Sequence, residues 1–163
     1  MKLFFLAIVF LIFVIVAIFV YLRYYYRFTI FKDMVYITKY LKNNISFNKN
    51  TIDELLQSLS KKISLVTRGI ISNNTSKKNS YLSNEDCLDI ERFINGLGKG
   101  DVSFEINNIT YYEKEFEEKK TVYRDSLNKE GKMYLKLIIV VGIAVCIILI
   151  WYKRSCFGYW YYF

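Results

Sequence analysis

The fold of this chain is decided by residues Asp101–Tyr152, which read DVSFEINNITYYEKEFEEKKTVYRDSLNKEGKMYLKLIIVVGIAVCIILIWY. The first part of this stretch is charged and contains no proline, whereas the remainder, from Leu135 onward, is almost wholly apolar. A single helix over the whole stretch would be roughly 78 Å long, and about 30 Å of that length would cross the hydrocarbon of a bilayer. The stretch therefore predicts a charged helical stalk that runs directly into a membrane span.

A second apolar run lies near the start of the chain. Leu3–Leu22 (LFFLAIVFLIFVIVAIFVYL) contains no charged residue and is long enough to cross a bilayer as a helix. A cleaved signal peptide is the competing interpretation, but the apolar core is too long for one, and no small-residue cleavage site precedes the bulky YLRYYYRF. Because interfacial tyrosines and the basic Arg23 and Arg27 follow directly, we expect a retained anchor.

The two apolar runs divide the chain into four expected parts. Residues 1–22 and 133–152 are expected to be transmembrane helices, residues 23–132 a helical domain, and residues 153–163 a short aromatic tail. The chain contains no proline, so the strongest helix breaker is absent. The predicted fold class is all-α, with two transmembrane helices flanking a helical bundle and the last long helix running into the second span.

Apolar residues at spacings of three and four predict helices between the spans. The expected apolar faces are Phe28, Phe31, Met34, Val35, Ile37, Leu41 and Ile45 on a first helix, and Ile52, Leu55, Leu56, Leu59 and Ile63 on a second. The expected helices are Thr29–Ile45, a second from Thr51 with Glu54 completing a capping box, and a third from Ser83, with Asp86 in a near capping box, to Asn95-Gly96.

Two segments between these helices are expected to be irregular. Ser72–Ser80 is polar and unpatterned, which predicts a loop. Gly96–Gly100 holds three glycines, and Gly96 is expected to close the third helix in a left-handed conformation. A phosphate-cradling loop is the alternative, but no strand precedes these glycines and no Lys-Ser/Thr pair follows them. We therefore expect a plain turn, after which Asp101 caps the long helix.

The long helix carries an apolar stripe and a charged face. Ile109, Phe116 and Tyr123 fall seven residues apart, and this stripe predicts packing either on the first two helices or on a second copy of the chain. Acidic residues precede Lys119 and Lys120, which favours pairs such as Glu115 with Lys119 one helical turn later. Glu113, Glu115, Glu117 and Glu118 are therefore interpreted as a solvated face and not as acid–base machinery.

The distribution of basic residues predicts the orientation in the membrane. Nine basic residues lie near the spans on the side of residues 23–132, and three lie beyond the spans. This excess places residues 23–132 in the cytoplasm and both termini across the membrane. Lys136 lies near the cytoplasmic end of the second span, from which its long side chain can reach the headgroups. The residues taken as topology determinants are Arg23, Arg27 and Lys136.

The composition excludes several classes of function. The chain has no histidine, which removes the commonest general base and metal ligand. Three cysteines without paired spacing give no disulfide or zinc signature. Although the net charge is +8, basic residues beside membrane spans report topology and contact with membrane lipid more often than nucleic-acid binding. We therefore expect no catalytic site, cofactor, metal or nucleic acid, and no cluster of titratable residues in an apolar region.

The order and spacing of several short motifs resemble the stage III sporulation protein AB family of endospore-forming bacteria. Leu97-Gly98-x-x-Asp101 is similar to the family's Leu-Gly-x-x-Asp turn. Lys132-Met133-Tyr134 is similar to its motif at the start of the second span, and Gly142 falls on a glycine of that span. Residues 41–56 are similar to a family helix–turn–helix. The departures are Asn50-Thr51 in place of Thr-Pro, Glu105 in place of Gln, and a region at about Ser64–Ser80 that is short against the family and has lost much or all of a helix.

The resemblance implies a role that composition does not. The family's cytoplasmic domain resembles the inner-membrane platform protein of type II secretion systems, which couples a ring ATPase to membrane subunits. The implied function is a non-catalytic adaptor of the channel between mother cell and forespore, with the sporulation AA ring ATPase and other channel subunits as partners. It would lie in the mother-cell membrane, and self-association is left open. The alternative is a generic coiled-coil membrane scaffold of a secretion or division complex.

Overall fold

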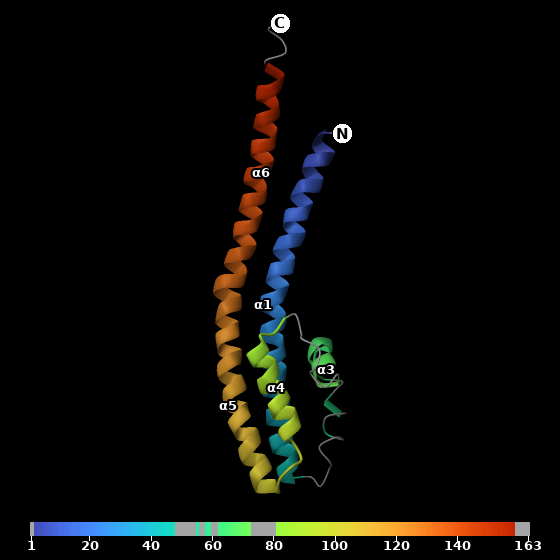
Figure 1. Ribbon diagram of the computed structural model, residues 1–163, viewed down its shortest axis with the longest axis vertical. Helices are drawn as coiled ribbons and strands as arrows, with labels where there is room; N and C mark the ends of the chain where they lie inside the picture. Colours follow the sequence, from blue (N-terminus) through green and yellow to red (C-terminus); the bar gives the residue numbers. More distant parts are fainter. Residues whose placement is uncertain (1, 48–54, 56–57, 60–61, 73–80, 159–163) are drawn as a thin grey trace. The chain divides into compact units, whose positions relative to one another are not determined.

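The computed structural model confirms the all-α fold class, and its described residues form helices without any strand (Figure 1). These residues are 2–47, 55, 58–59, 62–72 and 81–158. The elements within them are α1 (Lys2–Phe47), α3 (Leu65–Ser72), α4 (Asn84–Gly96), α5 (Val102–Ser126), the π-helical turn η1 (Leu127–Gly131) and α6 (Lys132–Gly158).

Helix α1 joins two elements that the sequence analysis placed apart. The first apolar run and the amphipathic segment expected to begin at Thr29 form one unbroken helix that ends at Phe47. The expected start of a separate helix at Thr29 is therefore wrong. The physical reason is that the intervening YLRYYYRF contains no glycine, proline or capping side chain that would end a helix.

The chain divides into two compact units. The first contains Met1–Arg23 and Leu127–Phe163, and the second contains Tyr24–Ser126. The first unit thus holds the apolar half of α1 together with η1 and α6, whereas the second holds the remainder of α1 with α3, α4 and α5.

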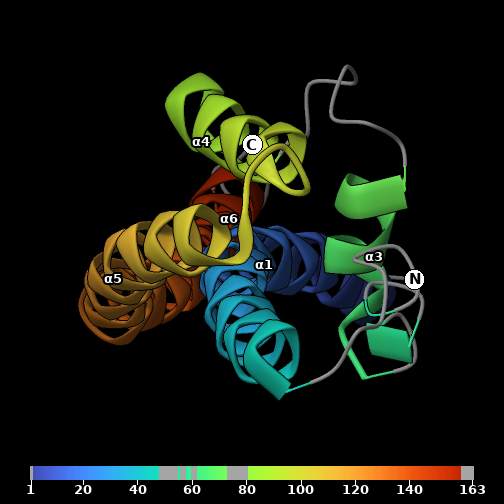
Figure 2. The ribbon, with the colours of Figure 1, turned by 90° about the horizontal axis from the view of Figure 1, so that it is seen from below.

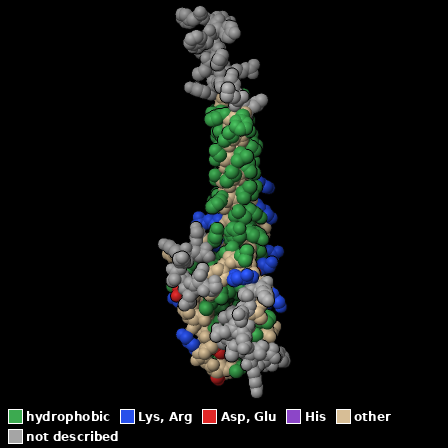
Figure 3. Space-filling model, turned by 90° about the vertical axis from the view of Figure 1, so that its right-hand side faces the viewer, with side chains coloured by type: hydrophobic (Ala, Val, Ile, Leu, Met, Phe, Trp, Pro, Cys, Tyr) green, Lys and Arg blue, Asp and Glu red, His purple; other side chains and the backbone are tan. Residues whose placement is uncertain are grey.

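The first unit exposes apolar side chains along both of its helices. The two most apolar windows of the chain lie in helices spanning Phe4–Ile45 and Val102–Trp151, and only 6% of each window is buried. Figure 3 shows this surface as a nearly continuous field of hydrophobic side chains. Core helices of a soluble protein bury such residues, so the length, composition and exposure of these helices are those of membrane-spanning segments.

The two helices of the first unit approach closely at one glycine. Gly142 of α6 is buried, and a Cβ atom built on it would lie 2.9 Å from the Cβ atom of Phe13 on α1. Small residues allow helices in a membrane to pack at short distance because no side chain separates their backbones. The glycine that the sequence analysis singled out in the second span therefore lies at the contact with the first.

The second unit has an apolar core around α1. Figure 2 shows α4 and α5 beside α1, with α3 on another side of it. The expected apolar face of the first helix is confirmed, because Phe31, Met34, Val35, Ile37 and Leu41 are buried. The other core members include Ile30 of α1, Ile90 and Phe93 of α4, and Ile109 and Phe116 of α5.

The stripe of the long helix faces this core. Ile109 and Phe116 are fully buried, Tyr123 packs partly buried against the same cluster, and the rings of Phe31 and Phe116 lie 6.0 Å apart. Of the two packing arrangements that the sequence allowed, the structure shows the one within the chain. The burial of Ile109 and Phe116 within the chain accounts for the apolar stripe, so packing on a second copy of the chain is not needed to explain it.

The segment between α1 and α4 differs from the expectation. Helix α3 (Leu65–Ser72) occupies the first half of the region that was expected to have lost a helix. The capping pair Thr51 and Glu54 lies outside the described residues, as does most of the expected loop Ser72–Ser80. Leu55, Leu59 and Ile63, from the expected face of the second helix, are buried in the core.

The long C-terminal helix is interrupted by a π turn. Regular α-helix resumes at Lys132, and Leu127 and Gly131, at the two ends of η1, are both buried. The π turn is a local widening of the helix, and Gly131 is its last residue.

Candidate functional site

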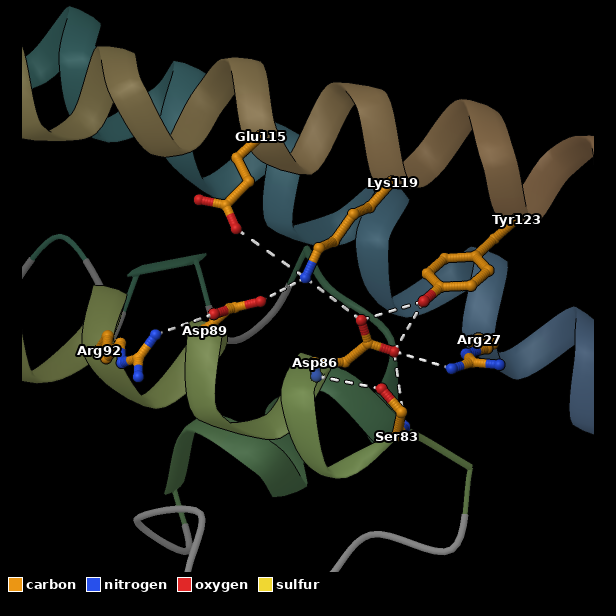
Figure 4. Close-up of polar contacts among 8 residues, drawn as sticks. All are labelled: Arg27, Ser83, Asp86, Asp89, Arg92, Glu115, Lys119 and Tyr123. Carbon is orange, nitrogen blue, oxygen red and sulfur yellow. Dashed lines mark hydrogen bonds and ion pairs between the residues drawn. The ribbon is translucent and has the colours of Figure 1, made fainter.

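The most organised polar site in the second unit is centred on Asp86, at the third position of α4 (Figure 4). Its carboxylate is almost fully buried and accepts a hydrogen bond of 2.9 Å from Arg27 of α1. The Tyr123 hydroxyl of α5 lies 2.8 Å from the same oxygen, Asp86 Oδ2. The Ser83 side chain accepts from the backbone N–H of Asp86, which completes the expected capping box. One carboxylate therefore joins three helices.

Lys119 of α5 extends the site along α4. Its ammonium group lies 3.3 Å from Asp86 Oδ1 and also donates to Asp89. Glu115, one turn earlier on α5, is 3.9 Å from the same ammonium, and Arg92 pairs with Asp89 at 3.5 Å. The expected pair of Glu115 and Lys119 is thus present, but the closest partners of Lys119 are on α4. We call these residues the Asp86 cluster: Arg27, Ser83, Asp86, Asp89, Arg92, Glu115, Lys119 and Tyr123.

The protonation states in the Asp86 cluster follow from its contacts. Burial raises the pKa of Asp86, but hydrogen bonds from Tyr123, Arg27 and Ser83 outweigh it and hold the pKa below its ordinary value. Burial and the bond to Asp86 raise the pKa of Tyr123 to about 12. Burial lowers the pKa of Lys119, but the bond to Asp89 and the charge of Asp86 dominate and raise it. At neutral pH all of these groups keep their usual charge.

The charges in the Asp86 cluster balance. Three carboxylates face two guanidinium groups and one ammonium group, and the Arg27 guanidinium also lies 4.4 Å from the centre of the Tyr123 ring. Each carboxylate is held by a cation on the same or a neighbouring helix, so none is poised as a free acid or base. Among the described residues, no three metal-ligating side chains gather to hold an ion. The arrangement fixes helices against one another.

The sequence analysis missed this cluster and wrongly expected no grouping of titratable residues in an apolar setting. The capping pattern Ser83-x-x-Asp86 was visible because it is local. Arg27 was interpreted only as an anchor at the membrane surface, yet its guanidinium binds Asp86. Because Arg27 and Asp86 are 59 residues apart, no spacing rule links them.

A second polar contact holds α3 on α1. The Asp33 carboxylate accepts hydrogen bonds from the Ser64 backbone N–H at 3.0 Å and from the Thr67 hydroxyl at 2.8 Å. Ser64 in turn accepts from the Thr67 N–H and so caps the helix that begins at Leu65. The local part of this cap, Ser64-x-x-Thr67, is visible in the sequence, but the helix that follows it has only eight residues.

The turn between α4 and α5 takes its shape from Gly98. Leu97 is the C-cap of α4, and its N–H donates to Ile94 O at 3.3 Å. Gly98 has φ 78°, a conformation that a residue with a Cβ atom rarely adopts, so the left-handed glycine is Gly98 and not Gly96 as expected. The Asp101 carboxylate accepts from the Phe104 N–H at 2.9 Å, which confirms Asp101 as the cap of α5.

Glu105 fills the inside of this turn. Its Oε1 atom accepts from the backbone N–H groups of Lys99 at 2.9 Å and Gly100 at 3.2 Å. These N–H groups are the donors that a bound phosphate would need. The structure therefore supports the plain turn, closed by a carboxylate of the chain itself.

The other sequence-predicted residues lie in the first unit. Lys132, Met133 and Tyr134 form the first turn of α6 and are exposed. Arg23 and Lys136 are also exposed. Leu97, Gly98 and Asp101 belong to the second unit.

These features define an all-helical protein with two apolar helices of membrane-spanning length and a helical unit whose helices meet at the buried carboxylate of Asp86. The family model of stage III sporulation protein AB matches residues 70–150, and the chain belongs to this family. The match confirms the resemblance drawn from the sequence motifs and gives the protein a role in sporulation. No curated protein and no solved structure matches the chain.

Proposed function

We propose that the protein is a non-catalytic membrane platform of the channel between mother cell and forespore. In this role it couples a cytoplasmic ring ATPase, the sporulation AA ATPase, to the membrane subunits of the channel. The observation that carries the proposal is the family match over residues 70–150, which includes α4, α5, η1 and most of α6. The matched region thus joins a packed helical unit to an apolar helix of membrane-spanning length.

The Asp86 cluster supports a mechanical role and not a chemical one. A platform must keep its helices in register while a partner pulls on them. The buried carboxylate of Asp86 resists separation from Arg27 and Lys119, because loss of either partner leaves a poorly compensated charge in an apolar setting. Helices α1, α4 and α5 are tied together in this way, and α1 and α5 lead on to the two apolar segments.

The proposed orientation places residues 23–132 in the cytoplasm of the mother cell. Basic residues are more frequent on this side of both apolar segments, as the positive-inside rule requires. Protease treatment of sealed, inverted membrane vesicles tests the orientation. Digestion of residues 23–132 is expected, and their protection would remove a cytoplasmic ATPase as a partner.

Binding to the ATPase is tested with the full chain in detergent. The purified protein is expected to retain the sporulation AA ATPase in a pull-down. The control is the same membrane protein carrying Asp86→Asn, which disturbs the helical unit but leaves the apolar segments unchanged. Equal retention by both forms, or none by the wild type, would contradict coupling through the helical unit.

A further inference from the structure

Three exposed lysines lie at the start of the second apolar segment, one in η1 and two in α6. Lys129 precedes Lys132 by three residues, and the four-residue interval from Lys132 to Lys136 places these two on neighbouring turns of one face of α6. Figure 3 shows Lys and Arg side chains along one edge of the apolar surface of this unit. We call these three residues the lysine stripe.

In the described ranges, several lysines of the second unit have counter-charges, whereas those of the lysine stripe do not. Lys39, Lys42, Lys119 and Lys120 of the second unit each pair with a carboxylate. Within the part of the chain that the structure describes, no carboxylate pairs with any member of the lysine stripe. From Leu127 to Gly158 the sequence contains one acidic residue, Glu130. The stripe therefore presents a net positive charge.

The position of Lys136 decides what can neutralise this charge. The residue lies on α6 just before the run LIIVVGIAVCIILI, within a helix of membrane-spanning composition. A lipid phosphodiester lies at the depth where this helix enters the hydrocarbon. Lysine stems extend along apolar surface and hold the ammonium at the headgroup level, and a compact ammonium binds phosphate as a point charge.

We propose that the lysine stripe is a binding site for the headgroup of an anionic phospholipid, such as phosphatidylglycerol. The site takes the lipid phosphodiester in preference to a zwitterionic headgroup, because a net negative charge is needed to neutralise three lysines. This inference requires that α6 spans a bilayer, but it does not require the ATPase. Its failure would leave the proposed platform role untouched.

The experiment measures which lipids the full chain retains. The protein is purified in nonionic detergent, mixed with equal amounts of phosphatidylglycerol and phosphatidylcholine, and analysed by native mass spectrometry. The wild type is expected to retain phosphatidylglycerol preferentially. The triple variant Lys129→Gln, Lys132→Gln, Lys136→Gln is expected to lose this preference. The ratio of retained phosphatidylglycerol to phosphatidylcholine should fall by about fivefold for each lysine removed. Millimolar inorganic phosphate is not expected to displace the lipid, and displacement would overturn the assignment to a lipid headgroup.

The matched control removes the same charge elsewhere. Lys32, Lys99 and Lys114 are exposed lysines of the second unit, and their triple glutamine variant is expected to retain the preference. An unchanged preference in the lysine-stripe variant, or an equal loss in the control, overturns the proposal. If the triple variant is not recovered folded, the single Lys136→Gln decides, with an expected loss of about fivefold.

Discussion

The Tyr123 hydroxyl of α5 donates a hydrogen bond of 2.8 Å to the carboxylate of Asp86 at the start of α4. The same carboxylate binds Arg27 of α1. Three helices that are distant in sequence thus meet at one buried negative charge. The stability of the second unit should depend on this charge more than on any exposed ion pair of the chain.

Replacement of Asp86 by asparagine keeps the shape of the side chain and removes its charge. Arg27 and Lys119 then face each other without their shared counter-charge, and the expected loss of stability is about 3 kcal/mol. Tyr123→Phe removes one hydrogen bond to a charged group and is expected to cost about 2 kcal/mol. Thermal unfolding of the full chain in detergent, followed by circular dichroism, measures both losses. The control is Glu85→Gln, an exposed neighbour on α4, whose effect should stay within about 0.5 kcal/mol.

The pH dependence of stability follows from the same contacts. The pKa of Asp86 is depressed in the folded protein, so its stabilising contribution is present above the ordinary value of 3.8 and is lost as the pH falls through the folded value. The pKa of Tyr123 is raised from 10.0 to about 12, so its contribution is complete below pH 10.0 and is lost as the pH rises toward 12. Ultraviolet titration of tyrosinate measures the second effect. The Tyr123→Phe variant should lack a component near pH 12, and an unchanged titration curve would contradict the hydrogen bond to Asp86.

Local patterns in the sequence predicted much of the fold. Phe31, Met34 and Leu41 recur at helical spacing, and the structure buries all three. The capping box at Ser83 was also predicted, because its two partners are three residues apart. Such features depend only on neighbours along the chain, so the sequence contains all the information that they need.

Contacts between distant residues could not be predicted in the same way. Asp86 and Arg27 each have an ordinary local role, as a capping residue and as a basic residue after an apolar run, and neither role points to the other. Helix α3 was also not predicted, because it has only eight residues. Its cap, Ser64, accepts from the Thr67 N–H, and the Ser64 N–H is bound by the distant Asp33 of α1. Tertiary contacts stabilise a helix too short to form alone.

The turn after α4 should tolerate only glycine at position 98. Gly98 has φ 78°, and a side chain in this left-handed region costs about 1–2 kcal/mol. Gly98→Val is therefore expected to lower the thermal stability of the helical unit and to weaken assembly with partners, while membrane insertion is unchanged. The matched control is Gly69→Ala in α3, where a Cβ atom meets nothing within 4 Å. This substitution should be neutral or stabilising by about 0.5–1 kcal/mol, since alanine favours helix. Equal effects of the two substitutions would show that the conformation of Gly98 is not restrictive.

The contact between the two apolar segments should depend on Gly142. A Cβ atom at this position would lie 2.9 Å from Phe13 Cβ, which is closer than real Cβ atoms approach, and 3.1 Å from Phe13 Cγ. Gly142→Val is expected to separate the two helices and to lower the melting temperature in detergent. Ala144→Val on the same helix is the control, because Ala144 is exposed. If the two variants have the same melting temperature, close packing at Gly142 is not needed for stability.

Glu105 should be replaceable by glutamine but not by alanine. Its Oε1 atom accepts from the backbone N–H groups of Lys99 and Gly100, while Oε2 is buried without a hydrogen-bond partner among the described residues. Glutamine keeps the accepting oxygen and removes a buried charge, so Glu105→Gln should retain the turn. Glu105→Ala leaves both N–H groups without their acceptor and should cost about 2 kcal/mol, because hydrogen bonds to a charged group contribute more to stability than neutral ones. Amide hydrogen exchange at Lys99 and Gly100 measures the difference directly. Protection should persist in Glu105→Gln and disappear in Glu105→Ala, and protection in both variants would mean that another group closes the turn.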